Sequence, residues 1–169
     1  MTVRIVPWGP EHEAGVIALI SRIQREEFGL PITPEQQPDL CDVPGFYLGG
    51  GGNFWVALNA GGEVVGSIAL KDIGGGNGAL RKMFVRQDMR GREKGVAAAL
   101  LALLLDWAGD KGFASIFLGT TPFFLAAHRF YERNGFREIP TNDLPPGFPL
   151  MTVDTRFYRR DLAQVAPGA

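Results

Sequence analysis

The sequence predicts one mixed α/β domain in which about four helices accompany six or seven strands. Its 169 residues, 46% of them hydrophobic, suit a single compact core. Residues 54–58 and 63–70 are β-rich runs on either side of residues 59–62, whose asparagine and glycines favour a tight turn, so they predict an antiparallel hairpin. A strand-like run, a long helical pattern and a second strand-like run follow between residues 79 and 119, which predicts a parallel βαβ unit.

The part of the chain before the hairpin predicts one strand and two helices. Residues 1–10 contain the first strand, and residues 10–27 carry apolar side chains at the spacing of an amphipathic helix. Residues 34–40 begin with proline but are compatible with a helix, so they predict a second, shorter helix that leads into a loop.

The βαβ unit and the helix after it have clear boundaries in the sequence. Residues 79–85 predict its first strand, and a helix runs from residue 94 or 95 to residue 108, where alanines of high helix propensity accompany a stripe of larger apolar side chains. Residues 115–119 predict the second strand. Residues 122–133 predict the next helix, because proline suits its first position and Asn-Gly follows its end.

Two further strands are predicted at residues 136–139 and 151–159, on either side of a proline-rich loop at residues 140–149. Residues 161–169 are expected to be a disordered tail. Because no internal repeat or linker is visible, residues 1–169 are interpreted as one domain.

Composition excludes several classes of function. A formal net charge of -1, from 17 basic and 18 acidic residues, gives no global attraction to nucleic acid or to an anionic membrane. One cysteine and two histidines do not supply a structural zinc site, so no metal is expected. No window reaches the roughly 18 apolar residues of a membrane-spanning helix, and the N-terminus lacks the apolar stretch of a secretory signal. We therefore expect a cytoplasmic protein whose partners include neither nucleic acid nor membrane.

Basic residues concentrate where the strand at residues 79–85 leads into the long helix. Residues 81–94 contain six basic side chains and two acidic ones. A helix N-terminus offers unpaired amides and a partial positive charge, and Gly95 allows a phosphate to approach the main chain there. The alternative is a glycine turn with solvated charges. Walker A and dinucleotide-binding fingerprints do not fit, since Val96 and Ala97 follow the second glycine and the third glycine is missing.

The segment Arg-Glu-Lys-Gly-Val-Ala at residues 92–97 resembles motif A of the GNAT N-acetyltransferase superfamily, whose pattern is Gln/Arg-x-x-Gly-x-Gly/Ala at the start of a long helix. Residues 79–85 are similar to the fourth strand of that family, and residues 126–136 are similar to its motif B. The resemblance covers about residues 3–160 in the order that the family has. It implies a mostly antiparallel sheet that splays between two central strands, with acetyl-coenzyme A in the splay, and the family is often homodimeric.

The resemblance also implies which residues bind the cofactor. Backbone amides at the start of the long helix would hold the pyrophosphate, and main-chain groups of the fourth strand would pair with the pantetheine arm like a missing strand. The implied residues are Met83, Phe84, Val85, Arg90, Arg92, Glu93, Lys94, Gly95, Val96, Ala97 and Ala98.

Tyr131 stands where many family members have a tyrosine beside the thioester sulfur, so the resemblance implies that it is the general acid that protonates the leaving thiolate. The alternative is a tyrosine that serves packing. Many relatives have a glutamate on the fourth strand, but Ala79 takes that place here, and no base is assigned. Phe124 replaces an asparagine that often contacts the cofactor, and Thr120 or Thr121 is a candidate substitute.

Four carboxylates lie on segments that could border the site of the acceptor amine, although a solvated or capping role is the simpler interpretation of each. They are Glu27, Asp42, Asp72 and Asp154. Four aromatic residues could form the mouth of that site or could equally belong to the core. They are Phe28, Phe46, Tyr47 and Phe148.

The function implied by the resemblance is direct transfer of an acetyl group from acetyl-coenzyme A to a primary amine of a small molecule or peptide, without a metal. An alternative of a different class is an acyl-coenzyme A sensor or partner-binding module without catalysis, which suits the missing glutamate. Nucleic-acid binding through the basic turn is disfavoured, because the patch is short and lacks interleaved aromatic residues.

Overall fold

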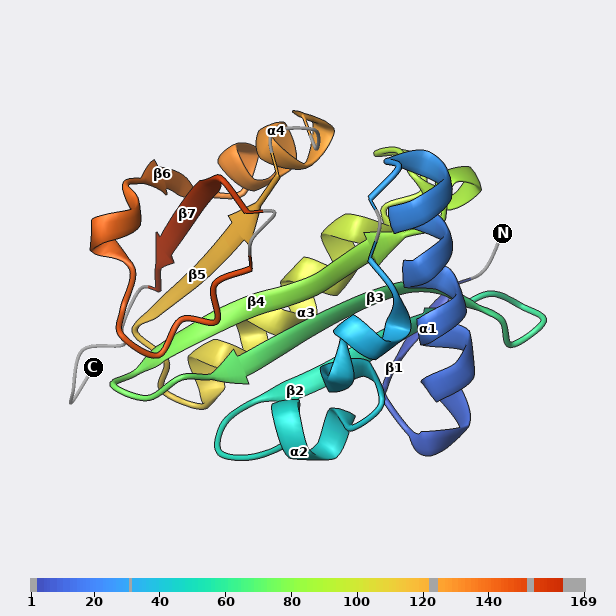
Figure 1. Cartoon of the computed structure of the whole chain (residues 1–169), viewed down its shortest axis with the longest axis horizontal. Coiled ribbons are helices and arrows are strands. Elements are labelled where there is room, and N and C mark those ends of the chain that lie inside the picture. Colours follow the sequence, from blue (N-terminus) through green and yellow to red (C-terminus); the bar gives the residue numbers. More distant parts are fainter. Residues whose placement is uncertain (1–2, 31, 122–124, 152–153, 163–169) are drawn as a thin grey trace.

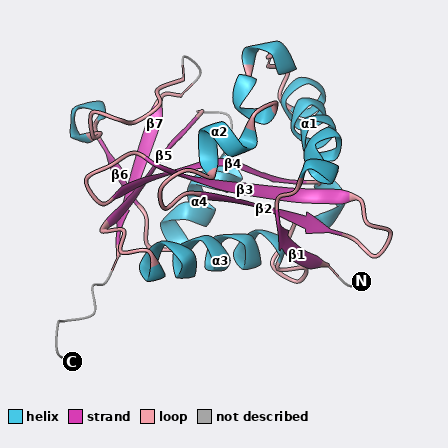
Figure 2. Cartoon of the chain, turned by 90° about the horizontal axis from the view of Figure 1, so that it is seen from below, coloured by secondary structure: helices cyan, strands magenta, loops and turns pink. Residues whose placement is uncertain are grey.

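The computed structural model describes residues 3–30, 32–121, 125–151 and 154–162. A seven-stranded sheet in the order β1-β2-β3-β4-β5-β7-β6 forms the centre of the molecule. Helices α1 and α2 cover one face of the sheet and α3 covers the other (Figure 2). All strand pairs are antiparallel except β4 and β5, so the mixed, mostly antiparallel sheet is as predicted.

The N-terminal half of the sheet is an antiparallel meander. The predicted hairpin is present and joins β2 to β3 through a turn in which Gly62 has a φ of 82°. Alternating side chains of these strands reach the cores on both faces, which is why the runs are almost continuously apolar. The strands of this half are β1 (Arg4–Pro7), β2 (Asn53–Leu58), β3 (Val64–Asp72) and β4 (Asn77–Val85).

The first helical region is less regular than its sequence pattern. Helix α1 (Glu13–Arg22) continues into a π-helical turn (Ile23–Glu27). The short helix predicted at residues 34–40 is instead a pair of 3₁₀ turns, and α2 (Val43–Tyr47) lies in the segment predicted as loop. The Asp42 side chain accepts a hydrogen bond from the Gly45 amide and so caps α2.

The second half of the fold contains the predicted βαβ unit and the two strands beyond it. Helix α3 packs on β2, β3 and β4, and β5 returns parallel to β4. Residues 122–124, at the predicted start of α4, lie outside the described residues. The elements of this half are α3 (Val96–Asp110), β5 (Ser115–Thr120), α4 (Leu125–Arg133), β6 (Arg137–Ile139) and β7 (Arg156–Asp161).

The last strand begins and ends later than predicted. Residues 151–159 were expected to form it, but β7 spans Arg156–Asp161, where it pairs with β5 along its whole length. Asp161 is therefore part of the sheet, and Leu162, also expected in the tail, packs against the main core. Met151, where the predicted strand was to begin, instead lines a cavity that is described below. Residues 163–169 lie outside the described residues.

The sheet opens between β4 and β5, as the resemblance implied. Their parallel pairing is confined to Asn77, Gly78 and Ala79 opposite Ser115, Ile116 and Phe117. Beyond this point the two strands diverge, and α4 lies near the end of β5 on the far side of the gap (Figure 1).

A bulge in β4 alters that strand at the start of the opening. Ser67 pairs with Phe84 and Ala69 with Arg81, so two residues of β4 face one residue of β3. Lys82 has a φ of 55° there, and the Ser67 hydroxyl donates a 2.7 Å hydrogen bond to its carbonyl. Positive φ in a side chain of this size is strained, and such strain concentrates at binding sites.

Candidate active site

A long cavity follows the open end of β4, the N-terminus of α3 and the near side of α4. Its volume is about 490 Å³, within the roughly 300–1,000 Å³ of small-molecule and cofactor sites. Many of the residues predicted to bind the cofactor lie in its wall, and their role in binding stays a prediction. They are Met83, Phe84, Val85, Arg90, Arg92, Gly95, Ala97 and Ala98.

The N-terminus of α3 presents free amides to this cavity. Gly95 precedes the helix in a left-handed conformation, and its own amide donates to the carbonyl of Gly91. No described residue accepts a hydrogen bond from the amides of Val96, Ala97 and Ala98. Together with the helix dipole, these amides make a site suited to a phosphate.

The remaining predicted residues have other surroundings. The Val96 side chain is buried in the main core, while Glu93 and Lys94 are exposed and the Lys94 ammonium donates to the carbonyl of Asp88. Arg90 donates from Nε to the carbonyl of Val85 and from both terminal nitrogens to the carboxylate of Glu27. Arg90 thus ties the end of β4 to the turn after α1, as well as lining the cavity.

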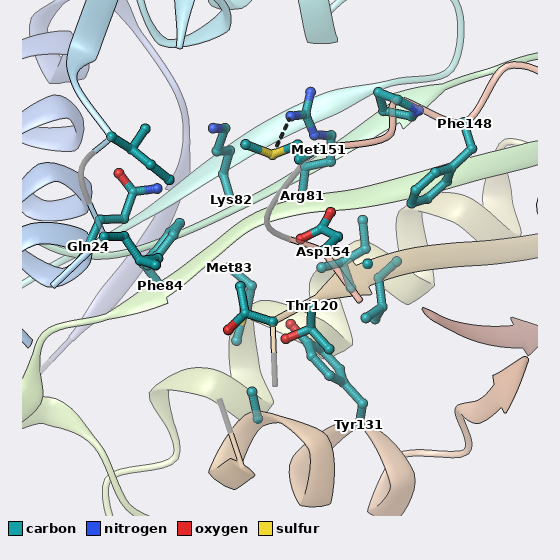
Figure 3. Close-up of a pocket in the computed structure, with 18 residues that line it drawn as sticks. Gln24, Arg81, Lys82, Met83, Phe84, Thr120, Tyr131, Phe148, Met151 and Asp154 are labelled. Carbon is teal, nitrogen blue, oxygen red and sulfur yellow. Dashed lines mark hydrogen bonds between the residues drawn. The ribbon is translucent and has the colours of Figure 1, made fainter. Parts of the chain in front are cut away.

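A second, smaller cavity of about 110 Å³ lies on the other side of β4, where it faces the end of β5 and the loop before β7. The two cavities share Met83 and Phe84 on β4 and Ala127 and Tyr131 on α4, so they meet at the gap between the diverging strands. Figure 3 shows this smaller cavity with Tyr131 below it and Arg81, Lys82 and Met151 above it.

Tyr131 occupies the junction of the two cavities. It is 6% exposed and its ring packs edge-on against Phe130 and Phe136. Burial raises the pKa of the Tyr131 hydroxyl well above its ordinary value, so the group stays protonated. No described residue forms a hydrogen bond with that hydroxyl, and Figure 3 shows the side chain directed from α4 toward Thr120.

Thr120 adds a second hydroxyl at this junction. The residue is 4% exposed, it lines the smaller cavity, and its Oγ1 is buried without a hydrogen-bond partner among the described residues. Unpaired buried hydroxyls are uncommon, and a ligand can supply the missing partner. The resemblance made Thr120 or Thr121 the candidate substitute for the asparagine that Phe124 replaces. Thr121 also lines the smaller cavity, and Phe124 lies outside the described residues.

Of the four carboxylates considered, only Asp154 reaches the smaller cavity. Glu27 pairs with Arg90, Asp42 caps α2, and Asp72 accepts hydrogen bonds from backbone amides, so these three have the structural roles that were the simpler interpretation. Burial raises the pKa of Asp154 from 3.8 to about 6, although the nearby charges of Arg81 and Lys82 act against that shift.

Two basic residues of β4 also belong to the smaller cavity. Arg81 and Lys82 were counted with the basic segment at the helix N-terminus, but the structure places them at the opposite face of the gap. Both residues lie within a largely buried strand, and this position distinguishes them from the basic residues of the turn that follows it. The Lys82 ammonium is 3.3 Å from the Asp39 carboxylate and donates to the side-chain oxygen of Gln37.

The four aromatic residues considered for the mouth of the acceptor site divide between the two alternatives. Of these four, Phe148 lines the smaller cavity and Phe28 lines the long one. Tyr47 is fully buried and its hydroxyl donates to Asp39, and Phe46 lies on the surface beside Lys71. The smaller cavity is more polar than the long one.

Two other expectations can be compared with the described residues. None of their helices has both the length and the hydrophobicity needed to cross a membrane. No group of three or more histidine, cysteine, aspartate or glutamate side chains in these ranges could hold a metal ion.

The comparisons with known proteins agree with this geometry. Residues 17–136 match the model of the Acetyltransferase (GNAT) family. The rat N-acetylaspartate synthetase is 33% identical over 149 residues, which are 86% of this chain and 49% of that protein. The chain thus spans about half the length of this curated relative.

Solved structures share the fold. A GNAT-family acetyltransferase from Staphylococcus aureus Mu50 has a TM-score of 0.92 and 36% identity, over 96% of this chain and 100% of that one. The PaiA N-acetyltransferase from Thermoplasma acidophilum, solved in complex with coenzyme A, has a TM-score of 0.71 at 16% identity, over 95% and 99% of the two chains. The family match and the relatives together establish that the chain belongs to the GNAT acetyltransferase family.

Proposed function

We propose that the protein transfers an acetyl group from acetyl-coenzyme A to a primary amine of a small molecule or peptide. The observation that carries the proposal is the meeting of two cavities at Tyr131. One cavity is long and begins at a helix N-terminus, and the other is small and polar. Two substrates that enter from opposite sides of the sheet would meet at that point, which suits direct transfer.

The long cavity fits coenzyme A. The free amides at the start of α3 suit its pyrophosphate, and the diverging end of β4 offers main-chain groups to an extended pantetheine arm. The coenzyme A complex of a protein with the same fold supports this assignment. When bound, acetyl-coenzyme A supplies a thioester carbonyl that an amine can attack.

Tyr131 is the proposed general acid. Its neutral hydroxyl, without a partner among the described residues, is available to donate a hydrogen bond and a proton to the departing sulfur. Backbone amides of the bulged strand β4 would polarise the carbonyl oxygen.

The test is the substitution Tyr131→Phe. Turnover should fall by about 100-fold, since a general acid contributes roughly 10²–10⁴-fold, and the affinity for coenzyme A should change little. Tyr158→Phe is the matched control, because Tyr158 is also buried near Tyr131 but its hydroxyl donates to Glu132. Unchanged turnover in Tyr131→Phe would remove Tyr131 from the mechanism.

The second candidate is an acyl-coenzyme A sensor without catalysis, suggested by Ala79 at the place of the usual glutamate. Release of free thiol from acetyl-coenzyme A in the presence of amines separates the two functions. The name N-acetylaspartate synthetase refers to a small acetylated amine, which favours catalysis on a small molecule over a peptide end.

A further inference from the structure

Arg81 presents a guanidinium with weak partners to the smaller cavity. Its side chain is 15% exposed, and its nearest carboxylate oxygen, on Asp39, is 4.0 Å away. Its one hydrogen bond to a side chain in the described ranges is to the sulfur of Met151 at 3.4 Å, and sulfur is a poor acceptor. A guanidinium has five donors, so most of those on Arg81 remain available for an anion in the cavity.

Asp154 presents a carboxylate to the same cavity from the segment before β7. It forms no ion pair within 4.0 Å with a described residue, but Arg81 and Lys82 are close enough to act on its charge. It lies directly over Gly119, where an added Cβ would be 2.6 Å from its Oδ2. The absence of a side chain at residue 119 therefore makes the room that this carboxylate occupies.

The other charges near the cavity satisfy one another. The Lys82 ammonium contacts Asp39 and Gln37, and Asp39 also accepts the Tyr47 hydroxyl. Gln24 and Gln37 exchange hydrogen bonds through their side-chain amides. Among the described residues, this leaves Arg81, whose ion pair with Asp39 is long at 4.0 Å, as an available cation and Asp154 as an available carboxylate in a cavity of about 110 Å³.

We propose that the acetyl acceptor is a small amino acid, whose carboxylate pairs with Arg81 and whose ammonium group is held and deprotonated by Asp154. This inference rests on the proposed acetyl transfer. A cavity of about 110 Å³, below the roughly 300 Å³ of drug-sized sites, suits an acceptor of small size. A zwitterion matches the two groups because each of its charges meets the opposite charge, without an ion left unpaired in a largely buried site.

The protons balance in this scheme. The ammonium group gives one proton to Asp154, which later releases it to solvent. The amine nitrogen then bonds to the thioester carbon, the carbon–sulfur bond breaks, and the nitrogen loses its second proton. Tyr131 donates its hydroxyl proton to the departing sulfur, and the second proton from the nitrogen replaces it. The products are therefore an N-acetyl amino acid, coenzyme A thiol and one free proton.

The acceptor class is tested by thiol release with L-amino acids, their carboxamides and alkylamines of the same length. We expect turnover with free amino acids and little with the other two groups. Arg81→Gln should raise the KM for the amino acid by about 10- to 100-fold, as expected for a lost charge-assisted pair, and leave the KM for acetyl-coenzyme A unchanged. Arg4→Gln, an exposed arginine on β1, is the control.

Three results would overturn the acceptor class. If carboxamides and alkylamines react as fast as amino acids, the carboxylate is irrelevant, although the transferase assignment stands. The same holds if Arg81→Gln keeps the preference for free amino acids. Absence of thiol release with every amine in the panel would instead remove the transferase function and this inference together.

The role of Asp154 is tested by its pH dependence. The kcat/KM of the native protein for the amino acid should fall tenfold per unit below about pH 6, where Asp154 of the free protein becomes protonated. The other groups at the cavity are Arg81, Lys82 and Tyr131, and Asp39 lies behind Lys82. Asp154→Asn should lower kcat by about 100-fold or more and abolish the acidic limb. The exposed Asp143→Asn is the control, and an acidic limb that persists in Asp154→Asn refutes the assignment.

Discussion

At the scale of single residues, a glycine determines where the Asp154 carboxylate can lie. A Cβ on Gly119 would be 2.6 Å from Oδ2 of Asp154 and 3.1 Å from the Phe157 ring. Gly119→Ala therefore displaces the carboxylate without changing its chemistry. We expect kcat to fall about tenfold or more, because small misplacements of a catalytic group are costly, with coenzyme A affinity unchanged.

The control for Gly119→Ala is Gly109→Ala on α3. Nothing lies within 4 Å of the added Cβ at Gly109. This helix position should gain up to about 1 kcal/mol of stability, since alanine has the higher helix propensity. Kinetic measurements on both variants check the prediction, and equal kcat values would show that Asp154 tolerates displacement.

The pKa of Asp154 also determines the direction in which pH changes the free energy of unfolding. Burial raises its pKa from 3.8 to about 6, so the folded state binds the proton more tightly than the unfolded state. The free energy of unfolding therefore decreases as the pH rises through that window, and the loss is complete above about pH 6. Asp154→Asn avoids ionisation and should be more stable by up to about 2 kcal/mol at pH 8, with no gain at pH 4.

Urea denaturation of Asp154→Asn and the native protein at the two pH values checks this sign. A gain at pH 8 together with reduced turnover would mark Asp154 as a group retained for function at the expense of stability. A loss of stability at pH 8 would mean that the carboxylate is held by favourable pairing, which contradicts the raised pKa.

At the scale of elements, a buried polar cluster joins the 3₁₀ turns after α1 to the bulge in β4. Lys82 is the centre of that cluster, with its side chain 4% exposed and Asp39 opposite it. Lys82→Met should destabilise the fold by about 3 kcal/mol, because it removes the ammonium group nearest to the buried Asp39 carboxylate and leaves only the Tyr47 hydroxyl and the more distant Arg81. The exposed Lys111→Met should change stability by less than about 0.5 kcal/mol.

A double-mutant cycle separates this pairing from packing. Asp39→Asn combined with Lys82→Met should recover part of the lost stability, since neither charge then remains. Thermal unfolding of the three variants provides the measurement. Strict additivity of the two single effects would show that Lys82 and Asp39 are not energetically coupled.

At the scale of the whole molecule, the sequence predicted what depends on local patterns. The hairpin, the βαβ unit and α3 were predicted because turn chemistry and apolar periodicity lie within short segments. The smaller cavity was not predicted, because Arg81 and Met151 are 70 residues apart and meet only in the folded sheet. Asp154 was one carboxylate among four candidates, and its place in the wall of the smaller cavity, over Gly119, distinguishes it.

The two elements whose bounds or type were predicted wrongly also depend on contacts that a local sequence pattern does not contain. The sequence of residues 151–155 alternates like a strand, but pairing with β5 begins at Arg156. Prolines allowed a helix over residues 34–40, yet tertiary packing of the buried Asp39 and Leu40 favours two short turns. Local propensity is a weak guide wherever burial of particular side chains decides the conformation.

The proposed coenzyme A site between β4 and β5 predicts that the ligand stabilises the whole molecule. These strands pair only at Asn77–Ala79 and the facing residues, so a ligand in the splay adds contacts between the two halves of the sheet. Coenzyme A at about 100 times its Kd should raise the free energy of unfolding by about 2.7 kcal/mol and the Tm by roughly 5–10 °C.

Hydrogen exchange distinguishes this effect from nonspecific stabilisation. With coenzyme A, added protection should appear at Met83, Val85 and the first turn of α3, which are the main-chain groups proposed to bind the ligand. It should be weakest in the hairpin turn before Glu63, which lies away from both cavities. Arg81→Gln should retain the full shift in Tm, because its side chain lines the smaller cavity, the proposed acceptor site, and not the one proposed for the cofactor. A uniform rise in protection across both halves, or a Tm shift that Arg81→Gln abolishes, would contradict a cofactor site separate from the acceptor site.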